Sequence, residues 1–210
     1  MATSLNPFGF LPARKRDGQP NTEGYGQIVQ PVSNSAIGIT ALIPNNIYAG
    51  DVIAIDAAGT ITPNVLATMK ISGVFQGCQY VQNGEPKFSR YFPGGTSVSD
   101  VKLHVITDPA QTYFVQADAT LSDGELAIVN NYTVSTSAGS TITGQSSHAL
   151  NAAAVAVGTS VGAHIRVVGR KGIDGDSVNG NVASTDQYPI VECYVNAHRY
   201  NSLLATVSLA

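Results

Sequence analysis

Charged side chains are scarce in this sequence. Lys, Arg, Asp and Glu make up 12% of its 210 residues, about half the usual share in a soluble protein. Small polar residues and 21 glycines take their place. The net charge of −3 provides no overall positive field for DNA or RNA, so we expect no nucleic-acid partner. A surface of amides and hydroxyls loses little on desolvation, which suits a protein packed against neighbours.

Long apolar runs are absent as well. None approaches the roughly 18 residues that a membrane-spanning helix needs, so we expect no membrane partner. A secretory signal places its positive charges before its apolar stretch, whereas here Phe8–Leu11 precede the basic run Arg14–Arg16. Because this stretch is also short and interrupted by glycine, we predict that it is not a signal peptide.

Cysteine is limited to Cys78 and Cys193. Two cysteines cannot form a disulfide scaffold for a chain of this length. Because cysteine is among the most frequently buried residue types, we favour two buried free thiols. A single bridge between them remains the other option.

Short apolar runs separated by turn residues fill most of the sequence. No stretch keeps a period of 3.6 over three turns, and only residues 64–70 and 149–157 leave room for a turn or two of helix. Asn83-Gly84 is a strong hairpin signal. We therefore predict an all-β fold, an antiparallel β-sandwich or barrel with little helix. The expected strands are residues 36–43, 51–56, 71–81, 87–92, 100–107, 112–118, 163–171 and 188–200, with a further pair from 125–129 and 131–137.

The last expected strand alternates in a regular way. Glu192 and Tyr194 share one face, and Val191, Cys193 and Val195 share the other. This alternation supports a strand at this position.

Residues 1–35 have a different composition from the rest of the chain. Prolines and glycines recur throughout this segment, so it is predicted to be an extended N-terminal arm. We assign residues 36–210 to a single β domain. Two interpretations of the arm stay open: a strap laid across another protein surface, and a disordered tail.

Residues 126–165 contain no Asp, Glu, Lys or Arg. A hydroxyl-rich hairpin and loop is the plainer interpretation, since such stretches are common in β proteins. The other is a contact between subunits of a homo-oligomer, where unpaired charges would be costly.

A hydrolase site is considered and disfavoured. The sequence Gly-Thr-Ser-Val-Gly around Ser160 matches a nucleophile elbow, and Asp174, Asp176 or Asp186 followed by His198 would complete the order of a triad. That motif functions at a strand-to-helix turn above a mainly parallel sheet, and neither is expected here.

Other catalytic and metal sites are equally weak. Cys193 and His198 are five residues apart, which on a strand places them on opposite faces, and Cys78 has apolar neighbours. The histidines lack ligand spacing. Residues 174–185 begin like a calcium loop but lack its acidic twelfth position. We predict that the protein is not an enzyme and needs no metal or cofactor.

Several blocks of sequence, taken in order, resemble one protein family. The segment NPFGFLPARKRDGQP, residues 6–20, contains Gly-Phe-x-Pro, then basic residues, then Asp-Gly-x-Pro. Gly-Val-Phe-x-Gly-Cys-x-Tyr follows at 73–80, Asp-Pro-x-x-x-Tyr-x-Val-Gln-Ala at 108–117, and Asn-x-His at 196–198. Together these blocks resemble the virion structural proteins of tailed bacteriophages, in particular capsid cement or decoration proteins. The loop over residues 171–187 is longer than that family pattern.

This resemblance implies a partner and a location. A cement protein of this kind binds the outer surface of a shell built from a major capsid protein with the HK97 fold. Such proteins often sit as homotrimers at the local three-fold axes. The implied function is to stabilise the head by bridging capsid subunits.

The N-terminal arm supplies the candidate contact residues. We expect its apolar side chains to plug a pocket on a neighbouring capsid or cement subunit, and its basic side chains to meet acidic capsid groups. The apolar residues are Phe8, Phe10 and Leu11, and the basic residues are Arg14, Lys15 and Arg16.

One rival interpretation belongs to a different class of binding protein. A head- or tail-fibre module would recognise host surface glycans, which commonly stack on exposed aromatic rings. The chain has no Trp, and its tyrosines are scattered, so the cement interpretation is preferred.

Overall fold

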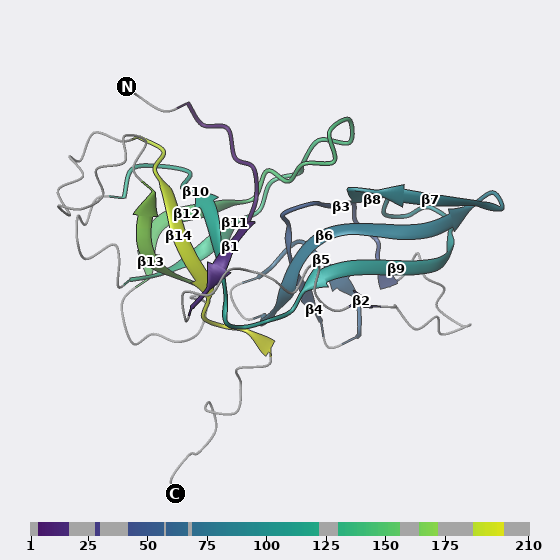
Figure 1. Cartoon of the computed structure of the whole chain (residues 1–210), viewed down its shortest axis with the longest axis horizontal. Coiled ribbons are helices and arrows are strands. Elements are labelled where there is room, and N and C mark those ends of the chain that lie inside the picture. Colours follow the sequence, from purple (N-terminus) through teal and green to yellow (C-terminus); the bar gives the residue numbers. More distant parts are fainter. Residues whose placement is uncertain are drawn as a thin grey trace, which may run out of the picture.

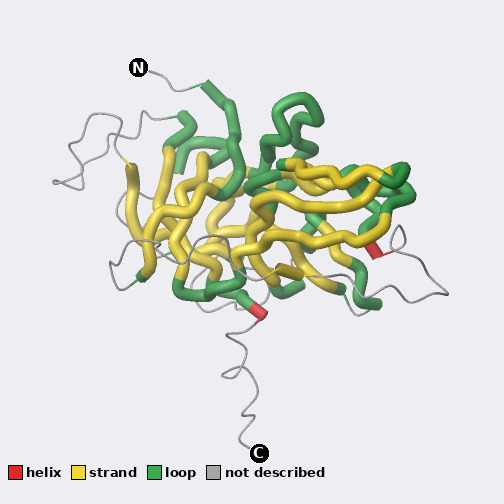
Figure 2. Tube along the Cα trace, turned by 45° about the vertical axis from the view of Figure 1, so that its right-hand side comes forward, coloured by secondary structure: helices red, strands yellow, loops and turns green. Residues whose placement is uncertain are grey.

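The computed structural model describes residues 4–16, 28–29, 42–56, 58–66, 69–121, 130–155, 164–171 and 187–199. Apart from single helical residues at Leu42 and Arg199, the regular structure in these ranges is strand, which confirms the predicted all-β class (Figure 2). The strands are β1 (Leu11–Lys15), β2 (Ile28–Val29), β3 (Ile47–Tyr48), β4 (Val52–Ile55), β5 (Ile61–Thr62), β6 (Ile71–Gln82), β7 (Glu85–Ser89), β8 (Tyr91–Phe92), β9 (Ser99–Ile106), β10 (Gln111–Gln116), β11 (Asn131–Ser135), β12 (Ala149–Val155), β13 (Ile165–Lys171) and β14 (Ile190–Val195).

Two antiparallel sheets follow one another along the long axis of the molecule (Figure 1). Sheet I has the strand order β1-β10-β14-β13-β11-β12. Sheet II has the order β2-β9-β6-β4-β5, with β7 paired to β6, and β3 and β8 form a separate two-stranded ribbon. Neither order closes on itself within the described residues, so the barrel alternative is not realised there.

Two apolar clusters form the core, and sheet II lies between them. Alternate residues of β4 show this arrangement, because Val52 and Ala54 belong to the cluster shared with sheet I and Ile53 belongs to the other. The ribbon adds Ile47 and Phe92 to that second cluster. Sheet II therefore buries side chains on both faces, which explains why its central strands are apolar at successive positions.

The predicted hairpin forms, but its return strand is shorter than expected. Asn83 and Gly84 have φ values of 54° and 80°, as a two-residue turn with positive φ requires. β7 pairs with β6 and ends before Arg90. Tyr91 and Phe92, expected in the same strand, pair with β3 instead.

Residues 149–157, where a turn or two of helix was considered, contain strand β12. Leu150 is fully buried in the cluster between the sheets, and β12 pairs with β11 in antiparallel register. These tertiary contacts override the helical preference of the alanines. β11 also pairs with β13. Residues 36–41 and 125–129, which were expected in strands, lie outside the described residues.

Residues 11–15 of the predicted N-terminal arm form strand β1 of sheet I. β1 runs antiparallel to β10, with Leu11 opposite Phe114. Phe10 has no exposed surface, and its ring meets the ring of Tyr113 edge-to-face at a centroid distance of 6.2 Å. Phe10 therefore fills a pocket of its own chain and not the neighbour's pocket that the sequence suggested.

The turn before β1 fits closely against two loops. The Phe10 backbone N–H donates to the carbonyl oxygen of Gly50 at 2.8 Å, and the side-chain amide of Gln145 donates to the carbonyl oxygen of Phe8. Gly9 has a φ of 75°, and a Cβ there would lie 2.5 Å from the Cβ of Ser146. Only glycine meets both conditions, so Gly9 is required for this docking.

Candidate binding cleft

The outer face of sheet I is produced by the alternation of β14. Val191 and Cys193 enter the core between the sheets and have no exposed surface. Glu192 and Tyr194 therefore lie on the opposite face, as the sequence pattern predicted.

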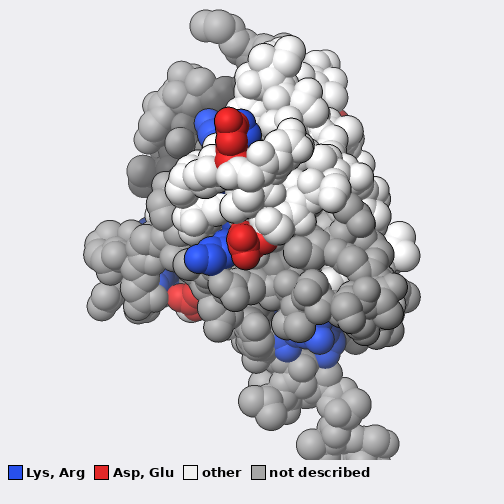
Figure 3. Space-filling view, turned by 90° about the vertical axis from the view of Figure 1, so that its right-hand side faces the viewer, with Lys and Arg blue, Asp and Glu red and all other residues white. Residues whose placement is uncertain are grey.

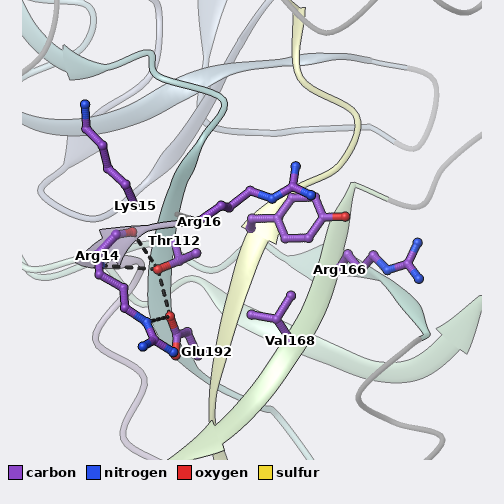
Figure 4. A pocket seen from close by; sticks show the side chains of 8 residues that line it. Arg14, Lys15, Arg16, Thr112, Arg166, Val168 and Glu192 are labelled. Atoms are coloured by element: carbon purple, nitrogen blue, oxygen red, sulfur yellow. Dashed lines mark hydrogen bonds and ion pairs between the residues drawn. The ribbon is translucent and has the colours of Figure 1, made fainter. Parts of the chain in front are cut away.

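Cross-strand register extends this polar face into a row of side chains. Tyr194 pairs with Thr112 of β10 on one side and with Arg166 of β13 on the other. β1 then brings the basic run to the far side of β10. The result is an open cleft of about 710 Å³ (Figure 4), lined by Arg14, Lys15, Arg16, Thr112, Arg166, Val168, Glu192 and Tyr194.

Arg14 is held by a carboxylate of its own chain. Its Nε and Nη2 donate to Oε1 and Oε2 of Glu192 at 2.8 and 2.9 Å, a two-point ion pair. The hydroxyl of Thr112 lies 2.9 Å from Oε1 of Glu192 and 2.7 Å from the carbonyl oxygen of Arg14. These contacts, drawn in Figure 4, join β1, β10 and β14 at one point.

The network fixes the charge of Glu192. Burial acts to raise the pKa of its carboxyl, but the hydrogen bonds from Arg14 and Thr112 and the charge of Arg14 outweigh burial and lower that pKa. The same hydrogen bond and charge raise the pKa of Arg14. Both groups are therefore charged at neutral pH. Inside the cleft, the negative charge of Glu192 is balanced by the positive charge of Arg14.

The other two residues of the basic run have different contacts. Nζ of Lys15 lies 3.5 Å from Oδ2 of Asp108, which precedes β10. The guanidinium of Arg16 lies over the ring of Tyr194, 4.2 Å from its centroid, in a cation–π contact. The three consecutive basic residues thus contact β14 twice and the loop before β10 once.

The structure brings together part of the predicted site. Arg14, Lys15 and Arg16 all line the cleft. The predicted apolar residues do not, because Phe10 is buried in the core, Phe8 is half-buried beside it in sequence, and Leu11 is 41% exposed on β1.

Sequence reasoning did not assign Arg166, Tyr194, Thr112 or Glu192 to this site. A usable signal was present, since Arg166 stands between Ile165 and Val167, both of which are fully buried. A charged residue between two core positions of a strand lies on the opposite face. Its distance from the basic run, however, depends on the pairing of β13, β14 and β10, which no local pattern reveals.

The disfavoured catalytic residues gain no support from their surroundings. Ser160, Asp174, Asp176 and Asp186 lie outside the described residues. Cys78 and Cys193 are buried and free, as favoured from the sequence. Burial raises the pKa of the Cys78 thiol to about 12 and raises that of Cys193 as well. Such thiols stay protonated and are poor nucleophiles.

Within the described ranges, no group of three or more His, Cys, Asp or Glu side chains is arranged to hold a metal ion. The described part of the chain also has no helix with the length and apolar character needed to cross a membrane.

A buried Asp–His–Ser cluster lies apart from the cleft. Asp51, Ser146 and His148 are each at most 2% exposed. Nε2 of His148 lies 3.4 Å from Oδ1 of Asp51, while its Nδ1 accepts a hydrogen bond from the Val52 N–H at 3.3 Å. The Ser146 hydroxyl donates to the Asp51 carboxylate. In a Ser-His-Asp triad the imidazole stands between the hydroxyl and the carboxylate, so this direct pairing differs from the order of a triad.

Comparisons with known proteins yield no relative: no family model matches the chain, and neither the curated proteins nor the solved structures contain a match.

Proposed function

We propose that this chain is a virion structural protein of a tailed bacteriophage, a capsid cement protein bound to the outer surface of the head. The observation that carries the proposal is the ordered set of family-like motifs along the chain. The first motif coincides with Gly9, Phe10 and β1, the segment that docks on sheet I and brings the basic run to the cleft.

The chemistry of the surface also supports an assembly role. Figure 3 shows one end of the molecule, where the described surface is mostly free of Lys, Arg, Asp and Glu. Two large apolar side chains project from this scaffold: Phe88 on β7 is 75% exposed, and Ile142 in the loop between β11 and β12 is 95% exposed. Uncharged surfaces with projecting apolar side chains are easily desolvated against a partner.

The proposed partner is a major capsid protein with the HK97 fold, and the proposed oligomer is a homotrimer at the local three-fold axes. We place the contact between cement subunits in the charge-free region 126–165. Its described part contains β12, the last strand of sheet I, and the projecting loop with Ile142. A terminal strand is the part of a sheet most readily extended or covered by another chain.

The mechanism is mechanical and includes no chemical step. A shell under internal pressure fails where neighbouring capsid subunits separate. A cement trimer that bridges them adds contact area there, with about 1,600 Å² buried at a standard interface. Several contacts made by one trimer reinforce each other, since each holds the next at a high effective concentration.

Particles purified with and without the protein test this proposal. We expect the protein on the outside of wild-type heads, where added protease and antibody reach it. We also expect heads that lack it to release DNA at a lower temperature, with recovery when purified protein is added back. Absence of the protein from finished particles would overturn the proposal.

A fibre module that binds host glycans is the alternative, and one observation favours it. Phe88 borders an open hollow of about 400 Å³ that is also lined by Gln76, Arg90 and His104. An exposed ring beside polar groups is a suitable platform for a sugar. Binding of the purified protein to host glycans, lost in Phe88→Ala, together with unchanged head stability would support this alternative.

A further inference from the structure

The four cationic residues of the cleft are not equivalent. Arg14 and Lys15 each have a carboxylate partner within the chain, Glu192 and Asp108. Among the described residues, no carboxylate pairs with the guanidinium of Arg16 or Arg166. As far as the described residues extend, two charges of the cleft are paired with a carboxylate and two are not.

Arg16 and Arg166 reach the cleft from its two sides and share one neighbour. Arg16 lies over the ring of Tyr194, and Arg166 is the cross-strand partner of Tyr194 in β13 (Figure 4). Stacking fixes the plane of a guanidinium while its N–H groups stay available at the edge. Tyr194 is the fixed member of the group, because it is 8% exposed and its strand lies inside sheet I.

We infer that this cleft binds an acidic segment of a partner protein, with a carboxylate held between Arg16 and Arg166. Arg14 already shows how a carboxylate is bound there, through a two-point contact with Glu192. Val168, which is 41% exposed, supplies an apolar wall for a neighbouring side chain of that segment. The identity of the partner rests on the proposed function, under which the segment belongs to the major capsid protein.

Charge favours a carboxylate-bearing peptide over a nucleic acid. The chain has a net charge of −3, and Glu192 stands inside the cleft. Polyphosphate backbones are bound through extended positive surfaces, whereas in the described part of the cleft the positive charge without a carboxylate partner belongs to two arginines.

Titration of the full chain with synthetic hexaglutamate tests the inference, with hexaglutamine and a DNA dodecamer as comparison probes. The readout is the NMR signal of each arginine Nε–H. We expect saturable shifts of Arg16 and Arg166 with hexaglutamate, none with hexaglutamine, and loss of binding in 1 M salt, where the screening length is about 3 Å. Unmoved signals for these two arginines overturn the inference, as does tighter binding of the dodecamer at the same site.

Variants then locate the site. We expect the Arg16→Gln/Arg166→Gln protein to bind hexaglutamate at least about tenfold more weakly, since two charge-assisted contacts are lost. Lys70→Gln/Lys87→Gln removes the same charge at exposed positions outside the cleft and is expected to bind like wild type. Arg16→Lys/Arg166→Lys keeps the charge, and its affinity for hexaglutamate is expected to lie between those of the other two variants. If the control variant loses as much affinity for hexaglutamate, the effect is due to net charge, and the proposed binding site is wrong.

The same variants separate this inference from the proposed function. Hexaglutamate bound in the cleft by a protein that is absent from virions would refute the cement role and leave the cleft intact. In the opposite case, the wild-type protein does not bind hexaglutamate, and the Arg16→Gln/Arg166→Gln variant binds phage heads as well as wild type does. That result would refute binding in the cleft and leave the cement role intact.

Discussion

Asp51 and His148 are buried together and have opposite pKa shifts. Burial raises the pKa of Asp51 to about 7, so between pH 4 and 7 the folded chain retains a proton that the unfolded chain has lost. That contribution makes stability fall as pH rises. Burial lowers the pKa of His148 to about 4, so over much of the same range the unfolded chain holds the extra proton and stability rises with pH. The two contributions oppose each other.

Removing one residue of the pair is expected to reveal how the other makes the unfolding free energy depend on pH. Relative to wild type, Asp51→Asn leaves the His148 contribution, and unfolding free energy should rise from pH 4.5 to 6.5 by up to about 1.4 kcal/mol per pH unit. His148→Gln should show the opposite relative slope. Urea unfolding across this pH range measures both, and only the slopes count, because each variant also loses buried contacts. If the unfolding free energies of all three proteins changed with pH in parallel, the opposite pKa shifts of Asp51 and His148 would be contradicted.

At the scale of elements, β1 is a short edge strand anchored at both ends. Directly before β1, Phe10 is buried in the core. Near the end of β1, Arg14 forms an ion pair with Glu192. Between them, the register with β10 shifts from Pro12 to Lys15, which leaves few ladder contacts in the middle. Apolar burial at Phe10 should therefore provide most of the free energy that holds the segment.

Two alanine variants of adjacent residues test this. Phe10→Ala leaves a cavity at a fully buried site and should lower the unfolding free energy by about 3–5 kcal/mol. Leu11→Ala is the matched control, since Leu11 is 41% exposed, and should cost less than about 1 kcal/mol. Chemical denaturation measures both. A Phe10→Ala protein as stable as Leu11→Ala would mean that the segment detaches without loss to the core.

Local patterns predicted the strands but not the position of β1. Alternation placed Glu192 and Cys193 on opposite faces, and Asn83-Gly84 marked its hairpin, because both signals depend on neighbouring residues. The N-terminal segment has no alternation, and its prolines and glycines favour irregular structure. Its pairing with β10 depends on the pocket around Phe10, which is built from residues distant in the sequence. The cleft is also built from residues distant in the sequence. Of its lining, only the basic run Arg14–Arg16 was predicted from the sequence.

At the scale of the whole molecule, sheet II couples the two apolar clusters. Val74 and Phe75 are consecutive in β6, yet Val74 faces the cluster shared with sheet I and Phe75 faces the cluster under the ribbon. A strand cannot lose its packing on one face and keep its position for the other. We therefore expect the two clusters to unfold together, as one cooperative unit.

One isoleucine from each cluster provides the test. Ile165 belongs to the cluster between the sheets and Ile53 to the other, and both are at most 1% exposed. Replacement of either by alanine should cost about 2–5 kcal/mol. Hydrogen exchange should then show faster exchange by a similar factor for the core amides of both sheets in each variant. Faster exchange limited to sheet II in Ile53→Ala, with sheet I protected as in wild type, would show two independent folding units.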